Sequence, residues 1–451
     1  MPRIFKTADY EATLDLKVSL REALPPDHLA RFVVDLVAQL DLSRFYARYS
    51  LCGGQPYAPE ILFALLLYGY CTGVFSSRKI ERATCDWLPF RFLAGDWHPG
   101  HDTIANFRRS FLVEIKELFV EVLLLAQEFG VLKLGNLSLD GSKVHADASK
   151  SKAVSYKRLL EMEVTIKREV EELFRLAEVA EQAELPEGVS VEEEIKFRQG
   201  RLERLAKAKA ALEERAQERY QAELAAYQEK LRERERKAQD SGRKPGGRPP
   251  QPPQPGPHEK DQYNFTDPRS RVMKNSTDDG FNQHYNAQVA VDQKSLLIVA
   301  NAVSQAANDK QQAVPTVEAI DRRVGKPEAV ALDNGYFSEK NIEELEARKI
   351  EPYIATGRES HHRSWQDHFA QQAEPPPAEA SAKEKMAYKL QTEIGKAIYG
   401  LRKCTVEPVI GIIKEVLGFR QFSLRGLVGA AGEWCLVCLA FNVKRLHGVL
   451  G

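Results

Sequence analysis

Two short apolar runs of the chain each end in an aspartate, and this pattern restricts the fold more than any other feature. The runs are LSLD at residues 137–140 and VALD at residues 330–333. Runs this short, bounded by turn residues, are typical of buried β-strands. If the two strands are parallel neighbours, Asp140 and Asp333 emerge at the same edge of one sheet. The sequence therefore predicts a sheet that can carry two carboxylates at one edge.

A third acid, Glu407, lies in the stretch TVEPVIGIIK, which is otherwise apolar or basic. Its neighbours in the sequence carry positive charge: Lys396, Arg402, Lys403, Lys414, Arg420 and Arg425. On a helix packed at the sheet edge, Glu407 would join the two aspartates. Clustered carboxylates repel one another unless cations fill the site, and divalent ions with oxygen ligands, such as Mg²⁺, suit such a set. The alternative for each acid is a solvated strand end or a salt-bridge partner.

The chain has 451 residues, so we expect two or three folded units. Residues 1–130 are predicted to be helical, because PPDHLARFVVDLVAQLD and YAPEILFALLLYGYCTGV carry apolar residues at spacings of three and four. Further helices are expected in SSRKIERATCDWL and in HDTIANFRRSFLVEIKELFVEVLLLAQEFG. Short helices with a basic member suit a helix-turn-helix DNA-binding unit, and a plain helical bundle with solvated arginines explains the same pattern.

Residues 151–240 are strongly charged and helical in pattern. Their charges alternate in sign, which is typical of a solvated face. The segment LPEGVS interrupts the pattern, so we expect two helices folded back as a hairpin with coiled-coil-like packing. The apolar seam of this hairpin consists of Leu202, Leu205, Leu212, Leu224, Tyr227 and Leu231.

Residues 241–262 are rich in proline and glycine and are predicted to form a mobile linker. Beyond it, YNAQVAVD and LLIVANAVSQ are predicted to be paired strands, and KQQAVPTVEAIDRRV a helix despite Pro315. SEKNIEELEARK is predicted to be a helix with Ser338 as its N-cap, and EPYIATG a strand. A loose segment, residues 359–385, precedes the helix that carries Glu407.

Composition narrows the class of protein. The 64 basic residues balance 64 acidic ones, so any surface for nucleic acid must be local. No run of eighteen apolar residues occurs, and the first residues, MPRIFKTADYEA, lack the apolar core of a signal peptide, so we expect no membrane span and a cytoplasmic protein. Cys435 and Cys438 lie among apolar residues and are predicted to be buried helix cysteines rather than zinc ligands.

Five motifs follow one another along the chain: LSLDGSKVHADASKSKAVSYKRL, TDPRSRVMKNSTDDGFNQHYNAQVAVD, ANDKQQ, ALDNGYFSEKNIEELEARKIEPYIATGR and LRKCTVEPVIGIIKEVLGFRQFSLRGL. Together they resemble a bacterial insertion-sequence transposase of the DDE type, related to the IS5 and IS1182 (IS4-like) families. Two earlier motifs, YAPEILFALLLYGYCTGVFSSRKIERA and HPGHDTIANFRR, resemble the helical domain that precedes the catalytic domain in that group.

The resemblance implies an α+β protein. Its RNase H-like catalytic domain would have a mixed sheet with flanking helices, begin at residues 131–150 and resume at residues 263–451 after the linker. An all-helical N-terminal DNA-binding domain (1–130) would precede it, and the helical hairpin (151–240) would be an insertion directly after the first catalytic strand. We expect the hairpin to mediate dimerisation or to grip DNA.

The resemblance also assigns residues. Asp140, Asp333 and Glu407 would be the catalytic, metal-binding triad. The related signature of tyrosine, arginine, glutamate and lysine would fall on Tyr399, Arg402, Glu407 and Lys414. The gap between arginine and glutamate is one residue longer than usual, so Lys403 is an alternative to Arg402. The expected DNA-contacting residues are Tyr399, Arg402, Lys403, Lys414, Arg420, Arg269, Arg271, Lys274, Arg78, Lys79, Arg108 and Arg109.

The implied function is DNA transposition: binding of the terminal inverted repeats, cleavage of phosphodiester bonds and joining of the freed 3′-hydroxyl to target DNA. The implied cofactor is Mg²⁺, with Mn²⁺ as a substitute. The partners would be double-stranded DNA and a second copy of the chain in the synaptic complex, in the bacterial cytoplasm and on the nucleoid when DNA is bound. The alternatives are an RNase H-like nuclease without strand transfer and a non-catalytic, transposase-derived DNA-binding protein.

Four further polar residues attract attention as potential ligands. His145 and Asp147 follow Asp140 in the sequence and are predicted to be local strand polarity rather than metal ligands. His361 and His362 lie in a polar stretch and are predicted to be solvated.

Overall fold

The structure is a computed structural model that describes residues 19–49, 55–180, 190–241, 247–275, 280–357, 375–377 and 379–450. The chain forms two compact units. Unit 1 combines Met1–Val144 with Tyr285–Gly451, and unit 2 is His145–His284. The predicted solvated pair His361 and His362 lies outside the described residues, as does most of the predicted loose segment.

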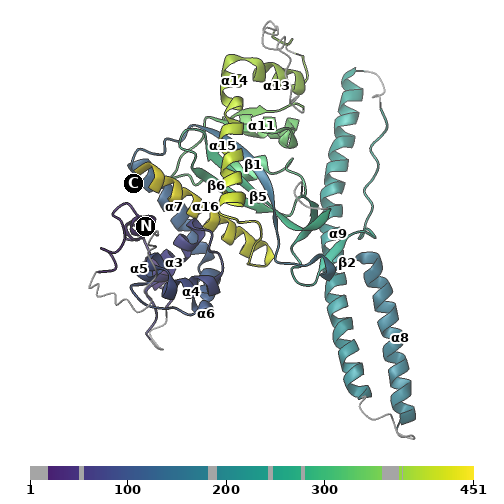
Figure 1. The fold of residues 1–451 in the computed structure, drawn as a ribbon. Helices are drawn as coiled ribbons and strands as arrows, with labels where there is room; N and C mark the ends of the chain where they lie inside the picture. Colours follow the sequence, from purple (N-terminus) through teal and green to yellow (C-terminus); the bar gives the residue numbers. More distant parts are fainter. Residues whose placement is uncertain are drawn as a thin grey trace, which may run out of the picture. The chain divides into compact units, whose positions relative to one another are not determined.

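A mixed β-sheet is the framework of unit 1 (Figure 1). Its strands are β1 (Asn136–His145), β5 (Phe281–Asp292), β6 (Ile298–Ser304), β7 (Ala329–Leu332) and β8 (Glu351–Ile354). They lie in the order β6-β5-β1-β7-β8, with β1, β7 and β8 parallel and β5 antiparallel to β6. The predicted pairing of YNAQVAVD with LLIVANAVSQ is confirmed, and so are the predicted strands at VALD and EPYIATG.

Local sequence signals explain the helices between these strands. Helix α11 (Glu339–Ala347) begins after Ser338, whose side chain accepts a hydrogen bond from the backbone N–H of Asn341, so the predicted N-cap is confirmed. Helix α10 (Ala313–Glu318) is shorter than the predicted helix. Pro315 lies in its first turn, where a proline removes no hydrogen bond within the helix.

Helix α16 (Gly426–Leu450) is the longest apolar helix of unit 1. It meets the length and composition of a membrane span, but 67% of its apolar window is buried inside the protein, so its packing is that of a core helix. It packs on β6, α3 (Pro59–Cys71) and α7 (Leu112–Glu128). Asn442 pairs with the backbone of Ile298 in β6, donating and accepting at 2.8 Å. Cys435 and Cys438 are buried in this helix, as predicted.

The N-terminal part of unit 1 is helical. Besides α3 and α7 it contains α1 (Leu29–Val37), α2 (Ser43–Tyr46), α4 (Ser77–Asp86), α5 (Leu88–Ala94) and α6 (His101–Ser110). The segment predicted as one helix from His101 onward is divided into α6 and α7 at Phe111, which leaves helical geometry at φ −113° and ψ 27°. Its ring stacks on Phe45 and Phe107, with centroids 5.0 and 4.7 Å away, so aromatic packing overrides the helical periodicity there.

A fully buried carboxylate joins these helices to the C-terminal helix. Glu433 of α16 accepts hydrogen bonds from the Tyr70 hydroxyl at 2.7 Å and from the backbone N–H groups of Ser423 and Leu424 at 2.8 and 2.9 Å. The Arg108 guanidinium lies 3.7 Å from the same carboxylate and also donates to the Tyr70 oxygen at 2.9 Å. The charge of Glu433 is therefore buried but well compensated.

This network corrects one predicted DNA contact. Arg108 is 6% exposed, and its guanidinium is held by Tyr70, Glu433 and the carbonyl oxygen of Phe75. The cause is a buried acid that the sequence pattern did not reveal. Its neighbour Arg109 is exposed and remains accessible.

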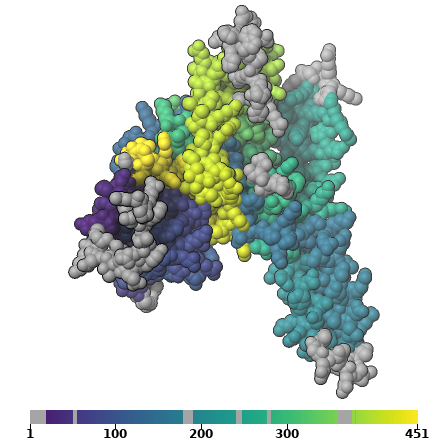
Figure 2. Space-filling model, viewed as in Figure 1, coloured from purple at the N-terminus to yellow at the C-terminus, as the bar shows by residue number. Residues whose placement is uncertain are grey.

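Unit 2 contains the helical hairpin. Helices α8 (Tyr156–Ala180) and α9 (Val191–Ser241) pack side by side, and Figure 2 shows them in contact along α8. Their shared core consists of Val154, Leu159, Ile166, Val170, Leu205, Ala208 and Leu212. Strands β2 (Ala153–Ser155) and β3 (Gln262–Asn264) pair antiparallel beside the helices, and β4 (Arg271–Lys274) pairs with the first residues of β5.

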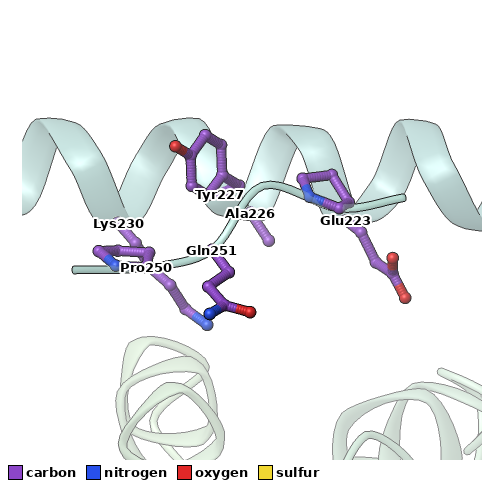
Figure 3. Close-up of a pocket in the computed structure, with 7 residues that line it drawn as sticks. Glu223, Ala226, Tyr227, Lys230, Pro250 and Gln251 are labelled. Carbon is purple, nitrogen blue, oxygen red and sulfur yellow. The ribbon is translucent and has the colours of Figure 1, made fainter. Parts of the chain in front are cut away.

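The proline-rich segment, which was predicted to be a mobile linker, lies against α9 in the structure. Arg234 donates to the carbonyl oxygen of Gly247 at 2.9 Å, and Arg219 donates to that of Gly256 at 3.1 Å. Figure 3 shows a pocket between the segment and α9, which is lined by Tyr227 and Lys230 of α9 and by Pro250 of the segment. The segment therefore covers the part of α9 that carries the end of the predicted seam. An extended proline chain can lie along a helix without a core of its own.

The buried network around Glu433 yields a prediction for stability. Replacing Arg108 by leucine removes one partner of a buried ion pair, and we expect it to lower the free energy of unfolding by about 3 to 5 kcal/mol. The matched variant Arg109→Leu, on the exposed neighbouring residue, should change it by no more than about 0.5 kcal/mol. Urea titration of the full chain measures both. Equal small effects would contradict the assignment of Arg108 to the core.

Candidate active site

The parallel pairing of β1 with β7 places two aspartates at one edge of the sheet. The strands pair in register from Asn136 opposite Ala329 to Leu139 opposite Leu332. Asp140 and Asp333 are the next residues of the two strands and therefore follow the same register. The condition that the sequence left open, parallel neighbouring strands, is met. Asp140 lies in the middle of β1 and Asp333 directly after β7, and the repulsion between their carboxylates sets the electrostatics of the site.

Helix α15 (Arg402–Gly411), labelled in Figure 1, carries the third acid. Side-chain hydrogen bonds hold this helix on β1. The Thr405 hydroxyl donates to the Ser138 hydroxyl at 2.7 Å, and both residues are buried. Gln293 donates to the same serine at 3.0 Å and to the carbonyl oxygen of Ile398 at 2.9 Å. Ser138 lies two residues before Asp140 and so on the same face of the strand.

Arg402 connects the acids of the strand and the helix. Its Nη1 lies 3.3 Å from Oδ2 of Asp140, and its Nη2 lies 2.9 Å from Oε1 of Glu407. The residue is 8% exposed, and its Nε is a buried donor without a hydrogen-bond partner among the described residues. Of the two alternatives that the sequence left open, Arg402 contacts the acids, and Lys403 is exposed.

Burial and mutual repulsion change the protonation of the aspartates. Burial, and after it the charge of Asp333, raise the pKa of Asp140 to about 6, although Arg402 opposes both effects. Burial also raises the pKa of Asp333, against hydrogen bonding from the Gly335 backbone and the charge of Arg402. Burial alone would lower the pKa of Arg402, but the charges around it, that of Asp140 first, raise it. The site is thus an acid pair stabilised by the Arg402 guanidinium, and the charge of Lys143 interacts with both aspartates as well.

A second polar network lies beside the pair, and the sequence analysis did not single it out. Asp309, in the motif ANDKQQ, accepts from the side-chain amides of Asn286 at 2.6 Å and Gln288 at 2.8 Å. Its Oδ1 also lies 3.6 Å from the ammonium of Lys143. The charge of Asp309 raises the pKa of both Asp140 and Asp333, so it belongs electrostatically to the same site.

Gly141 makes this close approach possible. A Cβ at this position would lie 2.8 Å from Oδ1 of Asp309 and 2.1 Å from Nε2 of Gln288, so a side chain would displace the network. The backbone N–H of Gly141 donates to Asp140 at 2.8 Å. The one feature of the sequence that could have indicated this network is the glycine directly after the first aspartate. A turn explains such a glycine equally well.

A π-helical turn places Lys414 on β1. Helix α15 continues into the turn Ile412–Val416, and the ammonium of Lys414 donates to the carbonyl oxygen of Lys143 at 3.0 Å. A π-turn inserts one extra residue and so changes the direction of the side chains after it. Lys414 is therefore a contact between this helix and β1 close to the acids.

The remaining sequence-predicted DNA contacts are distributed over several elements of the two units. Tyr399 lies in the last turn of α14 (Glu393–Gly400), and the Arg402 guanidinium lies 6.0 Å from its ring centroid. Arg420 is exposed and pairs with Glu415. Arg78 and Lys79 are exposed in the first turn of α4. Four of the predicted residues lie elsewhere: Arg109 in α6 of unit 1, and Arg269, Arg271 and Lys274 in unit 2.

The donor chemistry of the site suits a hard divalent cation, because Asp140 and Asp333 offer adjacent carboxylate oxygens in a buried setting. Glu407, however, is held by Arg402. Within the described part of the chain, no three or more His, Cys, Asp or Glu side chains are gathered so as to hold an ion. His145 packs on His284 in unit 2, with ring centroids 4.3 Å apart. The two aspartates could hold a metal ion in the arrangement that the structure shows. Glu407 could join them only if it gave up its ion pair with Arg402.

Two further helices, α13 (Ala382–Gln391) and α14, precede α15 in the sequence. Helix α13 begins with a capping box between Ser381 and Glu384, so the end of the predicted loose segment, residues 382–385, is helical instead. Helices α13 and α14 both pack on β8.

Two models of known families match parts of the chain. Residues 255–443 match the family model described as Transposase DDE domain, and residues 18–110 match the one described as Transposase domain (DUF772). The first match begins beyond α9, so it includes Asp333 and Glu407 but not Asp140. No curated protein and no solved structure matches the chain.

The raised pKa of Asp140 predicts how stability depends on pH. In the folded protein the Asp140 carboxyl stays protonated up to about pH 6, whereas in the unfolded chain its pKa is the ordinary 3.8. The protonated carboxyl therefore stabilises the folded state fully below pH 3.8, and this stabilisation is lost as pH rises through 6. In metal-free buffer with EDTA, Asp140→Asn should therefore gain stability relative to the wild type as pH rises from about 4 to about 7. Thermal unfolding at a series of pH values measures the difference.

A matched variant controls for the general effect of pH. Asp321 forms hydrogen bonds with Arg323, which lower its pKa, so Asp321→Asn should show no such gain over the same range. A difference between Asp140→Asn and the wild type that stays constant across the range would contradict the electrostatic account of the site.

Proposed function

We infer the reaction from one premise: this chain belongs to the insertion-sequence DDE transposases of the IS4/IS5/IS1182 type. It therefore acts on DNA. We propose that it binds the terminal inverted repeats of its element, cleaves phosphodiester bonds there and joins the freed 3′-hydroxyl to target DNA. The observation that carries this proposal is the register of β1 and β7, which brings Asp140 and Asp333 together at one sheet edge.

The proposed catalytic residues are Asp140, Asp333 and Glu407, on an RNase H-like domain. The strand order β6-β5-β1-β7-β8 is compatible with such a domain, and it puts both aspartates on central strands. Glu407 reaches the same edge from α15, where the Arg402 guanidinium contacts both its carboxylate and that of Asp140. Carboxylates fixed by the strands of a sheet are held in place before any substrate arrives.

The proposed cofactor is Mg²⁺, with Mn²⁺ as a substitute, held by Asp140 and Asp333. Bound at such a site, divalent ions stabilise the attacking and leaving oxygens of an in-line phosphodiester displacement. Arg402 offsets the charge of Asp140 and Glu407 in the protein alone.

The proposed DNA contacts follow from exposure and charge. Arg78, Lys79 and Arg109 are exposed on α4 and α6 of the N-terminal helices, within the segment that matches the second transposase model. Around the acid site, the proposed contacts are Tyr399, Arg402, Lys403, Lys414 and Arg420, and in unit 2 they are Arg269, Arg271 and Lys274. Arginine and lysine neutralise phosphates and supply most of the non-specific affinity for DNA.

We further propose a homodimer in the synaptic complex, because two element ends must be held together for joining. The proposed location is the bacterial cytoplasm, on the nucleoid when DNA is bound. A nuclease that cleaves without joining would use the same acids, so the assay must include a joining target.

The proposal predicts the outcome of a strand-transfer assay. With Mg²⁺, a labelled duplex that carries the element end and an unlabelled target should give a joined product. Asp333→Asn should lower its yield at least about a hundredfold, because it removes one carboxylate of the adjacent pair, while end binding measured in the same samples persists. Asp321→Asn, on a carboxylate that pairs with Arg323 outside this site, should retain activity.

Other outcomes separate the alternatives. Cleavage without a joined product would favour the nuclease. End binding by the wild type without chemistry in either Mg²⁺ or Mn²⁺ would favour a DNA-binding protein derived from a transposase. Full activity of Asp333→Asn would contradict the assigned site.

A further inference from the structure

Positive charge is concentrated at the base of the helical hairpin, although the chain as a whole is neutral. Residues 148–158 contain Lys150, Lys152, Lys157 and Arg158 and no acid. Residues 262–275 contain Arg269, Arg271 and Lys274 and a single acid, Asp267. The two segments are about a hundred residues apart in sequence, and neither stands out in a chain with alternating charges.

The fold of unit 2 brings these two segments together. In the β2–β3 ladder, Ala153 pairs with Asn264 and Ser155 with Gln262. The Asn264 amide donates to the carbonyl oxygen of Ser149 at 2.9 Å, and the backbone N–H of Phe265 donates to that of Lys152 at 3.0 Å. Joining two basic segments has an electrostatic cost that a polyanionic partner would offset.

The acid of the second segment supports the loop rather than neutralising its surface. Asp267 is 0% exposed, and its carboxylate accepts from the backbone N–H of Arg269 at 3.1 Å. Its own backbone oxygen accepts from the Ser270 hydroxyl at 2.8 Å. These bonds shape the loop that leaves Arg269 exposed. Lys150 and Lys152 are exposed on the short helical turn before β2.

Helix α9 contributes an arginine to the same place. The Arg215 guanidinium lies 5.6 Å from the ring centroid of Tyr263 and donates to the carbonyl oxygens of Gln262 and Pro268. Arg271 donates to the same Pro268 oxygen at 3.2 Å. Both arginines line a cavity of about 460 Å³, which Glu218 also lines. Arg219 lines it too, and its charge is paired with Asp261 at 3.0 Å.

We propose that this basic face, defined as Lys150, Lys152, Arg269 and the cavity lined by Arg215 and Arg271, binds the sugar-phosphate backbone of duplex DNA. The inference rests on the proposed function only in that DNA is the polyanion on which the chain acts. It gives the helical insertion a role: its base is a binding surface for DNA phosphates. A stacked arginine and tyrosine beside further cations is a common arrangement at such surfaces.

Contacts of this kind follow the backbone and not the base sequence, so the face should bind duplexes of any sequence. Each neutralised phosphate releases condensed counterions, and the logarithm of the affinity then falls linearly with the logarithm of the salt concentration, by about 0.9 per contact. The salt dependence therefore counts the contacts directly. If these residues had only a structural role, replacing them would not change the salt dependence of DNA binding.

The test uses the full-length protein and fluorescence anisotropy with a labelled duplex of unrelated sequence. EDTA is present, so no chemistry can occur, and the KCl concentration is varied. The variant Lys150→Gln/Lys152→Gln/Arg269→Gln removes three positive charges from the face. The matched control, Lys196→Gln/Arg204→Gln/Lys207→Gln, removes three from exposed residues of α9 away from it.

We expect the face variant to lose about 2 to 3 units of the salt slope and to bind at least about tenfold more weakly at a fixed moderate salt concentration. The control should keep the wild-type slope within about half a unit. Equal slopes for wild type and face variant would overturn the proposal. So would a loss of binding confined to duplex RNA or to vesicles with anionic lipid, with DNA binding unchanged.

The strand-transfer assay separates this proposal from the proposed function. If the wild type yields no joined product but its salt slope still depends on the face, the reaction is wrong and the basic face stands. If joining occurs and the slope is indifferent to the three substitutions, the reaction stands and the basic face is wrong.

Discussion

The repulsion between Asp140 and Asp333 is the interaction on which the account of this protein depends. Two half-buried carboxylates that adjacent parallel strands bring together destabilise the fold unless a cation offsets them. In the protein alone that cation is Arg402, which also holds Glu407. The Arg402 guanidinium thus lies between the carboxylates of Asp140 and Glu407 and keeps them apart at the same edge of the sheet. The proposed ligands of a divalent ion are therefore held in an arrangement that is stable without the ion.

The rest of unit 1 fixes the two sides of this site. On one side, Ser138 and Thr405 hold α15 on β1, and Lys414 binds the backbone of β1 beyond Asp140. On the other, Asp309 and its amide partners hold β5 against Gly141. The core helix α16 supports the sheet through Asn442 and joins the N-terminal helices through Glu433. Packing and hydrogen bonding thus position the acids from several directions, as a site needs when it must be rigid.

Much of this could be predicted from the sequence, because the signals were local. The strands at VALD and EPYIATG, the N-cap Ser338 and the buried cysteines of α16 each follow from a pattern within a few residues. The juxtaposition of Asp140 with Asp333 needed only one further condition, parallel pairing. By contrast, the choice between Arg402 and Lys403 depends on how α15 docks on β1, and the network of Asp309 depends on contacts between distant segments. The burial of Arg108 depends on Glu433, more than three hundred residues away in sequence.

The most direct measurement of the central claim is the binding of Mn²⁺ to the protein without DNA, followed by electron paramagnetic resonance of the free ion. The account predicts saturable binding by the wild type that is lost in Asp140→Asn and in Asp333→Asn and retained in Asp321→Asn. It also predicts that Arg402→Gln binds Mn²⁺ more tightly, because the resident cation no longer competes for the acids. Unchanged binding in both Asp140→Asn and Asp333→Asn would contradict the claim that these aspartates form the metal site.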